Sequence, residues 1–137
     1  MALTPRLSNE AANAEANAAV ALAQSGVLRI YDGSQPANAD ASIGGANVLA
    51  TLNFTAGSFG AATLGVSSLT AAISDASADL TGTAAWFRVW KSGGTAPLWD
   101  GSVGTTADTP NLVLDNNNIV IGGVVSVTAF TFTASKT

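Results

Sequence analysis

Hydrophobic and polar residues follow two different patterns along this chain, and the pattern changes at Gly26. Residues 8–25 are rich in alanine and contain neither glycine nor proline, which favours an α-helix. Ser8 is a typical N-cap, and Gly26 stands where many helices end on glycine. The sequence therefore predicts one helix over residues 8–25, preceded by a short N-terminal arm over residues 1–7.

The predicted helix carries two stripes at helical spacing. The apolar stripe is weak because it consists mostly of alanine, so we expect the helix to depend on the surface it packs against. Its members are Leu7, Ala11, Ala14, Ala18 and Leu22, with Val20 beside them. The second stripe consists of Asn9, Asn13 and Asn17, and a solvent-exposed face is its simpler interpretation.

After Gly26 the chain consists of short alternating segments separated by residues that favour turns, a pattern typical of β-strands. The strongest segment is TAAWFRVW, and the KSGG turn after it predicts a β-hairpin over residues 83–103. Imperfect alternation near the C-terminus predicts a bulge near Ala129. Other predicted strands are VLRIY (27–31), NVLATLNF (47–54), NLVL (111–114), IVI (119–121) and VVSVTAFTFTAS (124–135). The glycine-rich stretch 55–73 forms either two short strands or a loop.

About seven or eight short strands behind one helix indicate a mainly β protein, either an antiparallel β-sandwich or a small barrel. The chain of 137 residues has the length of one ordinary domain. We therefore expect residues 8–137 to form a single β-rich domain that includes the N-terminal helix.

Composition narrows the classes of function. Charged residues make up 10% of the chain, against about 25% in an average soluble domain. Such a surface repels its neighbours weakly, which suits a protein packed against its own copies or a partner; a neutral secreted domain is the alternative. The net charge of −4 and the scattered basic residues argue against a nucleic-acid partner. The chain contains no apolar run long enough to predict a membrane span. The acidic residues of its N-terminal region argue against a signal peptide.

Residue types needed for catalysis or metal binding are scarce. The chain has no cysteine and no histidine, so thiolate metal sites and the most common general base are both missing. Five aspartates fall in predicted turns, where a carboxylate usually accepts hydrogen bonds from backbone N–H groups: Asp75, Asp79, Asp100, Asp108 and Asp115. Two alternatives stay open, although no recognisable spacing marks either: a pair of catalytic carboxylates of the glycosidase type among these aspartates, and a calcium site at Asp75 and Asp79. We expect no enzyme activity, no catalytic residue, no cofactor and no metal site.

All three tryptophans lie within residues 84–104. Strand alternation places Trp86, Arg88 and Trp90 on one face, and we call these three residues the Trp–Arg–Trp ladder. Trp99 could join it across the predicted hairpin. The ladder is either functional, as a sugar-stacking platform or an interface hot spot, or a buried layer beneath the N-terminal helix, and the two interpretations carry equal weight.

Three segments, LRIYDGSQPA (28–37), SADLTGTAAWFRVWKS (77–92) and GGVVSVTAFTFT (122–133), resemble small virion proteins from the structural gene clusters of tailed bacteriophages and prophages. The likeness extends over nearly the whole chain. It implies a non-enzymatic structural protein, and among such roles it favours a capsid decoration (cement) protein. Proteins of that type sit on the outer capsid surface, bind the major capsid protein, stabilise contacts between its subunits and are often homotrimers.

Two alternatives stay open: a tail or head-to-tail component of the phage, and a carbohydrate-binding or adhesin module that uses exposed tryptophans. For the decoration protein, we expect the arm or the final TFTASKT segment to extend a strand or an apolar plug into a neighbour. The candidate interface residues are Leu3, Pro5, Leu7, Trp86, Arg88, Trp90 and Trp99.

Overall fold

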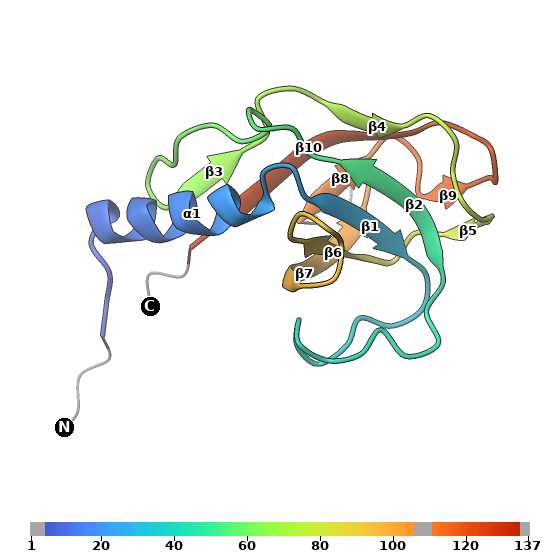
Figure 1. Cartoon of the computed structure of the whole chain (residues 1–137), viewed down its shortest axis with the longest axis horizontal. Helices are drawn as coiled ribbons and strands as arrows, with labels where there is room; N and C mark the ends of the chain where they lie inside the picture. The colour runs from blue at the N-terminus through green and yellow to red at the C-terminus, as the bar shows by residue number, and fades with distance from the viewer. Residues whose placement is uncertain (1–4, 106–110, 135–137) are drawn as a thin grey trace.

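A curled β-sheet forms the centre of the protein, and a single helix, α1 (Asn9–Ala23), lies at one end of it (Figure 1). The computed structural model describes residues 5–105 and 111–134. The strands are β1 (Val27–Tyr31), β2 (Val48–Asn53), β3 (Val66–Ser68), β4 (Ile73–Asp75), β5 (Gly82–Thr83), β6 (Trp86–Trp90), β7 (Pro97–Gly104), β8 (Leu112–Leu114), β9 (Asn118–Ile119) and β10 (Val125–Thr133).

The main sheet has the strand order β2-β1-β6-β7-β8-β10-β3, and β4 also pairs with β10. Strands β5 and β9 form a separate two-stranded ribbon. The sheet curls because the segment around β4 returns to β2: the Thr51 N–H donates to Asp75 Oδ2 at 3.0 Å, and the Asp79 N–H donates to the Leu49 carbonyl at 2.8 Å. The predicted fold class, mainly β with one N-terminal helix and a sandwich-like or barrel-like sheet, is confirmed. The sheet is mixed rather than purely antiparallel, because β7 and β8 run parallel.

Side chains from the concave face of the sheet form the main core. Phe130 lies at its centre, with its ring centroid 5.0 Å from that of Phe87 and 5.8 Å from that of Phe59. Aliphatic residues of β1, β2 and β6 complete this core: Leu28, Ile30, Leu49, Leu52 and Val89. Burying each such side chain stabilises the fold by about 1.5–3 kcal/mol.

The helix begins after Ser8 as predicted, but it ends at Ala23 rather than at residue 25, and Gly26 acts differently from the expectation. Ser8 is the N-cap and accepts a hydrogen bond from the Ala11 N–H at 3.1 Å. At the other end, Ser25 rather than Gly26 has a positive φ, of 62°. Gly26 is needed for close packing, since a Cβ there would lie 2.2 Å from the Trp90 carbonyl oxygen.

The face of α1 that contacts the domain differs from the predicted stripe. The buried residues are Ala12, Ala16, Val20 and Ala23, whereas Leu22 is 48% exposed. The solvent-exposed interpretation of the asparagine stripe is confirmed for Asn9 and Asn17, whereas Asn13 is half-buried. Two of these side chains also bind the domain: Asn13 Oδ1 accepts from the Gly65 N–H at 2.7 Å, and Asn17 Oδ1 accepts from the Ala62 N–H at 2.8 Å. Because the buried face of α1 is largely alanine, hydrogen bonds determine how the helix docks on the domain. Asn13 and Asn17 provide the acceptors.

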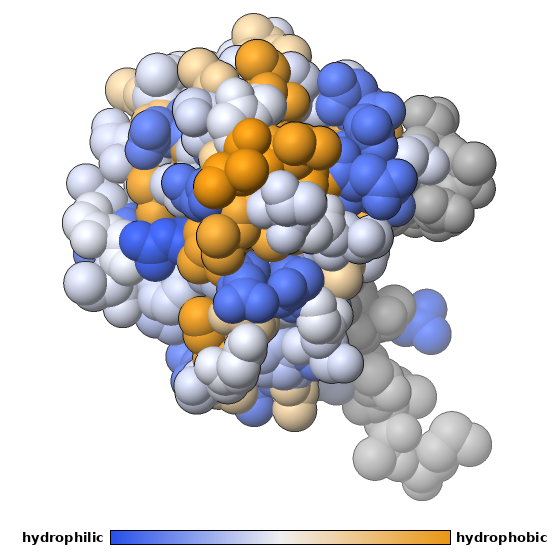
Figure 2. Space-filling model, turned by 90° about the vertical axis from the view of Figure 1, so that its right-hand side faces the viewer, coloured by the Kyte–Doolittle hydropathy of each residue, from blue (hydrophilic) through white to orange (hydrophobic). Residues whose placement is uncertain are grey.

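Most predicted strands are confirmed. The hairpin consists of β6 and β7, and the β10–β8 pairing shifts register between Val127 and Ala129, where the sequence predicts the bulge. The glycine-rich stretch 55–73 contains one short strand, β3, and β4 begins at its last residue, Ile73. The predicted strand 119–121 is wrong in part: only Ile119 belongs to β9, and Val120 and Ile121 lie in an exposed turn. That turn lies at the end of the molecule shown in Figure 2, where an apolar patch is surrounded by hydrophilic residues.

Candidate functional site

The Trp–Arg–Trp ladder forms on β6 as strand alternation predicts. The Arg88 guanidinium carbon lies 5.4 Å from the centroid of the Trp86 ring and 5.6 Å from that of the Trp90 ring, within the range of cation–π attraction. Tyr31 on the neighbouring β1 extends the layer. Its ring stacks on Trp86 with centroids 4.3 Å apart, and its hydroxyl accepts from Trp90 Nε1 at 3.1 Å.

Asp100 on β7 neutralises the charge at the centre of the ladder. The β6–β7 register places Asp100 opposite Arg88. Two parallel hydrogen bonds join them, from Nε to Oδ1 at 2.6 Å and from Nη2 to Oδ2 at 3.0 Å, and the side chains are only 2% and 4% exposed. The hydrogen bond to Asp100 raises the pKa of Arg88 above its already high value. The sequence prediction for Asp100, a turn cap, is therefore wrong: it is the partner of a buried cation.

The loop between β1 and β2, residues 32–47, covers the ladder. Arg88 Nη1 donates to the Ala41 carbonyl at 2.7 Å and Nη2 to the Asn38 carbonyl at 3.3 Å. Trp86 Nε1 donates to the Asp32 carbonyl at 3.0 Å. The expectation that a buried ladder would lie beneath the N-terminal helix is wrong, because the guanidinium and indole need carbonyl acceptors. An irregular loop has free carbonyls, whereas those inside a helix are already bonded to its own N–H groups.

Asp32 joins the two ends of the covering loop. Its Oδ1 accepts from the Asn47 N–H at 2.7 Å, and its Oδ2 accepts from Asn47 Nδ2 at 3.0 Å. These bonds favour the ionised carboxylate, with the side-chain amide contributing most, and they lower the pKa of Asp32. The cover over the ladder is therefore fixed both at its centre by Arg88 and at its base by Asp32.

Burial determines what the ladder can contact. Trp86 is 1% exposed and Arg88 2% exposed, while Trp90 remains partly exposed at the edge. A sugar ring or a partner protein reaches Trp90, but it reaches the other two only if residues 32–47 move. The arrangement favours the structural interpretation of the ladder over both functional ones.

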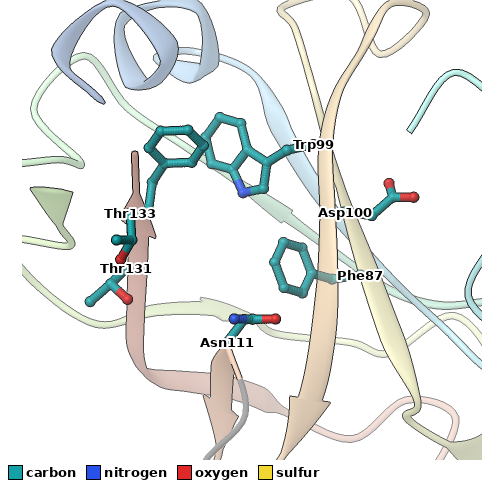
Figure 3. Close-up of a pocket in the computed structure, with 7 residues that line it drawn as sticks. Phe87, Trp99, Asp100, Asn111, Thr131 and Thr133 are labelled. Carbon is teal, nitrogen blue, oxygen red and sulfur yellow. The ribbon is translucent and has the colours of Figure 1, made fainter. Parts of the chain in front are cut away.

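Trp99 does not join the ladder. It pairs with Val89 in the hairpin, so its side chain belongs to the opposite face of the sheet. There it packs against Phe132, with ring centroids 4.7 Å apart, at the rim of a cleft of about 190 Å³ between β7 and β10 (Figure 3). Two of the polar side chains lining this cleft are already engaged: Asn111 Oδ1 accepts from the Ser102 N–H and hydroxyl, both at 3.1 Å, and Asp100 binds Arg88.

Three of the other aspartates predicted in turns accept hydrogen bonds. Asp75 accepts from the Thr51 and Ser77 N–H groups, and Asp115 accepts from the Asn116 N–H, so turn capping is confirmed for these two. Asp79 accepts from the Thr51 hydroxyl, and Asp108 lies outside the described residues. Within residues 5–105 and 111–134, no three acidic, histidine or cysteine side chains are grouped as a metal ion would require.

The terminal segments differ in how they are placed. Leu3 lies outside the described residues, Pro5 is exposed, and Leu7 packs against the buried alanines of α1. Residues 131–133 of the final segment pair with β3 inside this chain, and residues 135–137 lie outside the described part. Among the described residues of the arm, Leu7 therefore packs within this chain, which leaves the predicted plug untested.

An exposed apolar surface, which we call the tip, is not predicted from the sequence. Its residues are Leu80, Val120, Ile121 and Val124, exposed by 43%, 62%, 60% and 67%. Alternation predicts two strands around a turn for the run IVIGGVV, whereas the chain turns earlier and presents its β-branched residues outward. One feature of the sequence could have indicated this surface: branched apolar residues lie on both sides of the Gly-Gly pair, whereas turns ordinarily carry polar residues.

Comparisons with family models, curated proteins and solved structures found no match to this chain. In the described part of the chain, no helix has the length and apolar character needed to cross a membrane.

Proposed function

We propose that this protein is a non-enzymatic structural component of a tailed-phage virion, and specifically a capsid decoration protein. It binds the outer surface of the shell and stabilises contacts between major capsid subunits. The three segments that resemble phage virion proteins and the low charge of the chain support this role. Its localisation is then the outer capsid surface, its partners are the major capsid protein and its own copies, and a homotrimer is the expected form.

One observation carries the proposal: the residues best suited to recognition chemistry are used internally, while branched apolar side chains are exposed. The ladder is covered by its own loop, whereas the tip is presented to solvent on a surface with few charges. Exposed contiguous apolar residues are typical of protein–protein contact surfaces. This arrangement is what repeated docking on a lattice requires, with modest burial at each of many contacts.

The carbohydrate-binding alternative has less support. Sugar stacking needs accessible aromatic faces. In the ladder only Trp90 is partly exposed, and Trp99, on the opposite face of the sheet, is half-buried against Phe132. A tryptophan-fluorescence titration with a panel of sugars distinguishes the two roles, because the decoration protein should show no saturable change.

Fractionation and add-back of phage particles test the proposal. Particles from cells that carry the gene are separated into heads and tails, and the chain is located by mass spectrometry. We expect it in the head fraction, and we expect purified protein to rebind heads from which it has been stripped. Recovery in tails only, or absence from particles, would contradict the decoration role.

A further inference from the structure

The tip is an unusual turn because its apolar residues are held rigidly outward. The Gly122 N–H donates to the Ala78 carbonyl at 2.9 Å, and the Ala78 N–H donates back to the Gly123 carbonyl at 2.8 Å. The Ile121 N–H donates to the Thr81 hydroxyl at 2.9 Å. These bonds join residues 121–123 to Ala78 and Thr81 and thereby hold the turn with its apolar side chains outward. A rigid apolar projection loses little entropy when it binds, which makes it a good docking element.

Charges around the tip limit what it can bind. Asp79 precedes Leu80, and Asp115 lines the same surface hollow as Val120 and Val124. The described basic residues, Arg6, Arg29, Arg88 and Lys91, all belong to other parts of the chain. Tip-to-tip contact would bring carboxylates together, and an anionic lipid surface would also be repelled. The tip therefore fits an apolar surface with a basic rim.

The same chain has such a surface, which we call the β1–β6 groove. It is a hollow of about 390 Å³ whose apolar lining includes Ile43, Val48, Trp90 and Pro97. Arg29 lines it as well, over the Trp90 ring at 5.1 Å, and the exposed Lys91 follows Trp90 in the chain. Asp40 is the acidic residue of the lining, and the charge of Arg88 is already paired with Asp100. Within the lining the charges of Arg29 and Asp40 balance, so Lys91, which follows Trp90 in the chain, gives the edge of the groove its excess positive charge, opposite in sign to the rim of the tip.

We propose that the tip of one copy docks into the β1–β6 groove of a second copy. The tip lies beside β5 and β9, whereas the groove lies where the 32–47 loop passes β1, on a different side of the molecule (Figure 1). One copy can therefore use both surfaces at once, and the association is head-to-tail. This inference concerns self-association alone, so its failure leaves the capsid proposal to its own fractionation test.

Variants on each surface test the proposal by light scattering over a dilution series. The full-length protein should associate increasingly with concentration. Ile121→Asp on the tip and Ile43→Asp in the groove should each weaken association by at least about tenfold. Lys91→Glu, an exposed change near the groove, should weaken it in the same direction. The matched control is Leu64→Asp, since Leu64 is 61% exposed, against 60% for Ile121, and lies on neither surface.

Mixing the two defective variants gives the decisive result. Ile121→Asp retains an intact groove and Ile43→Asp an intact tip, so the mixture should form a one-to-one dimer while each variant alone stays monomeric. Near-ultraviolet circular dichroism first establishes that each variant is folded, and Lys91→Glu replaces Ile43→Asp if the latter is not. A wild-type monomer at every concentration, or no dimer on mixing, would overturn the proposal.

Discussion

Arg88 is the residue on which the largest polar network depends. One guanidinium binds the Asp100 carboxylate and two loop carbonyls, and it lies between two indole rings. A buried ion pair adds little net stability compared with an apolar pair, but removing one partner leaves an uncompensated charge. Arg88 therefore acts mainly by specifying where the 32–47 loop lies.

Replacing Arg88 by methionine should destabilise the fold by about 3–5 kcal/mol, because Asp100 stays buried without its partner. Urea unfolding gives the free energy directly. The control is Lys91→Met, which removes a cation from an exposed position on the same hairpin and should change stability by no more than about 0.5 kcal/mol. Equal effects of the two variants would contradict the structural role of Arg88.

Tyr31 offers a spectroscopic test of the same layer, because it is the only tyrosine in the chain. Burial raises the pKa of its phenol above the ordinary value of 10.0. The stability that this shift contributes is complete below pH 10.0 and is lost as the pH rises through the folded-state value. Phenolate absorbance should thus titrate at higher pH in the folded protein than in urea. Coincident titrations would show that the Tyr31 hydroxyl is solvated.

Among the elements, the helix and the hairpin are joined by close backbone contact at Gly26. A Cβ at this position would meet carbonyl oxygens of Trp90 and Ala23 at 2.2 and 2.8 Å. Neither oxygen belongs to a flexible side chain, so Gly26→Ala should cost more than about 2 kcal/mol of unfolding free energy. Gly45→Ala is the matched control because a Cβ at Gly45 would meet nothing within 4 Å, and it should be nearly neutral in thermal unfolding. Similar melting temperatures for the two variants would contradict the close contact.

The asparagines of α1 determine how the helix docks. Asn13→Ala combined with Asn17→Ala should destabilise the protein by about 1–2 kcal/mol, even though alanine favours a helix, because two N–H groups lose their acceptors. Hydrogen exchange should accelerate at the Gly65 and Ala62 amides in particular. Glu15→Ala, an exposed substitution on the same helix, should leave both amides protected, and unchanged exchange in the double variant would refute the docking role.

Local pattern predicts elements well in this chain, whereas contacts between distant elements decide their faces. The Ser8 cap, the hairpin and the Ala129 bulge depend on neighbouring residues, and all three are confirmed. The pairing of Arg88 with Asp100, and the isolation of Trp99 from the ladder, depend on a hairpin register with a bulge between Val89 and Trp90. That register cannot be read from alternation alone.

The same limit applies to the candidate site. Alternation predicts the members of the ladder, but it cannot indicate that a loop about fifty residues earlier in the chain supplies the cover, with Asn38 and Ala41 accepting from Arg88. The tip is not predicted because branched apolar residues favour strands, and here hydrogen bonds to residues 78–81 hold them in a turn instead.

The protein as a whole has its aromatic and ionic chemistry inside and a low-charge surface with an apolar tip outside. We propose that this distribution serves assembly, and that the assembly is a phage shell. Cryo-electron microscopy of particles from cells that carry the gene is the decisive measurement. We expect density for this fold, helix and curled sheet, in contact with major capsid subunits on the outer shell, and we expect it to be lost when the gene is deleted. Unchanged shell density after the deletion would contradict the decoration role.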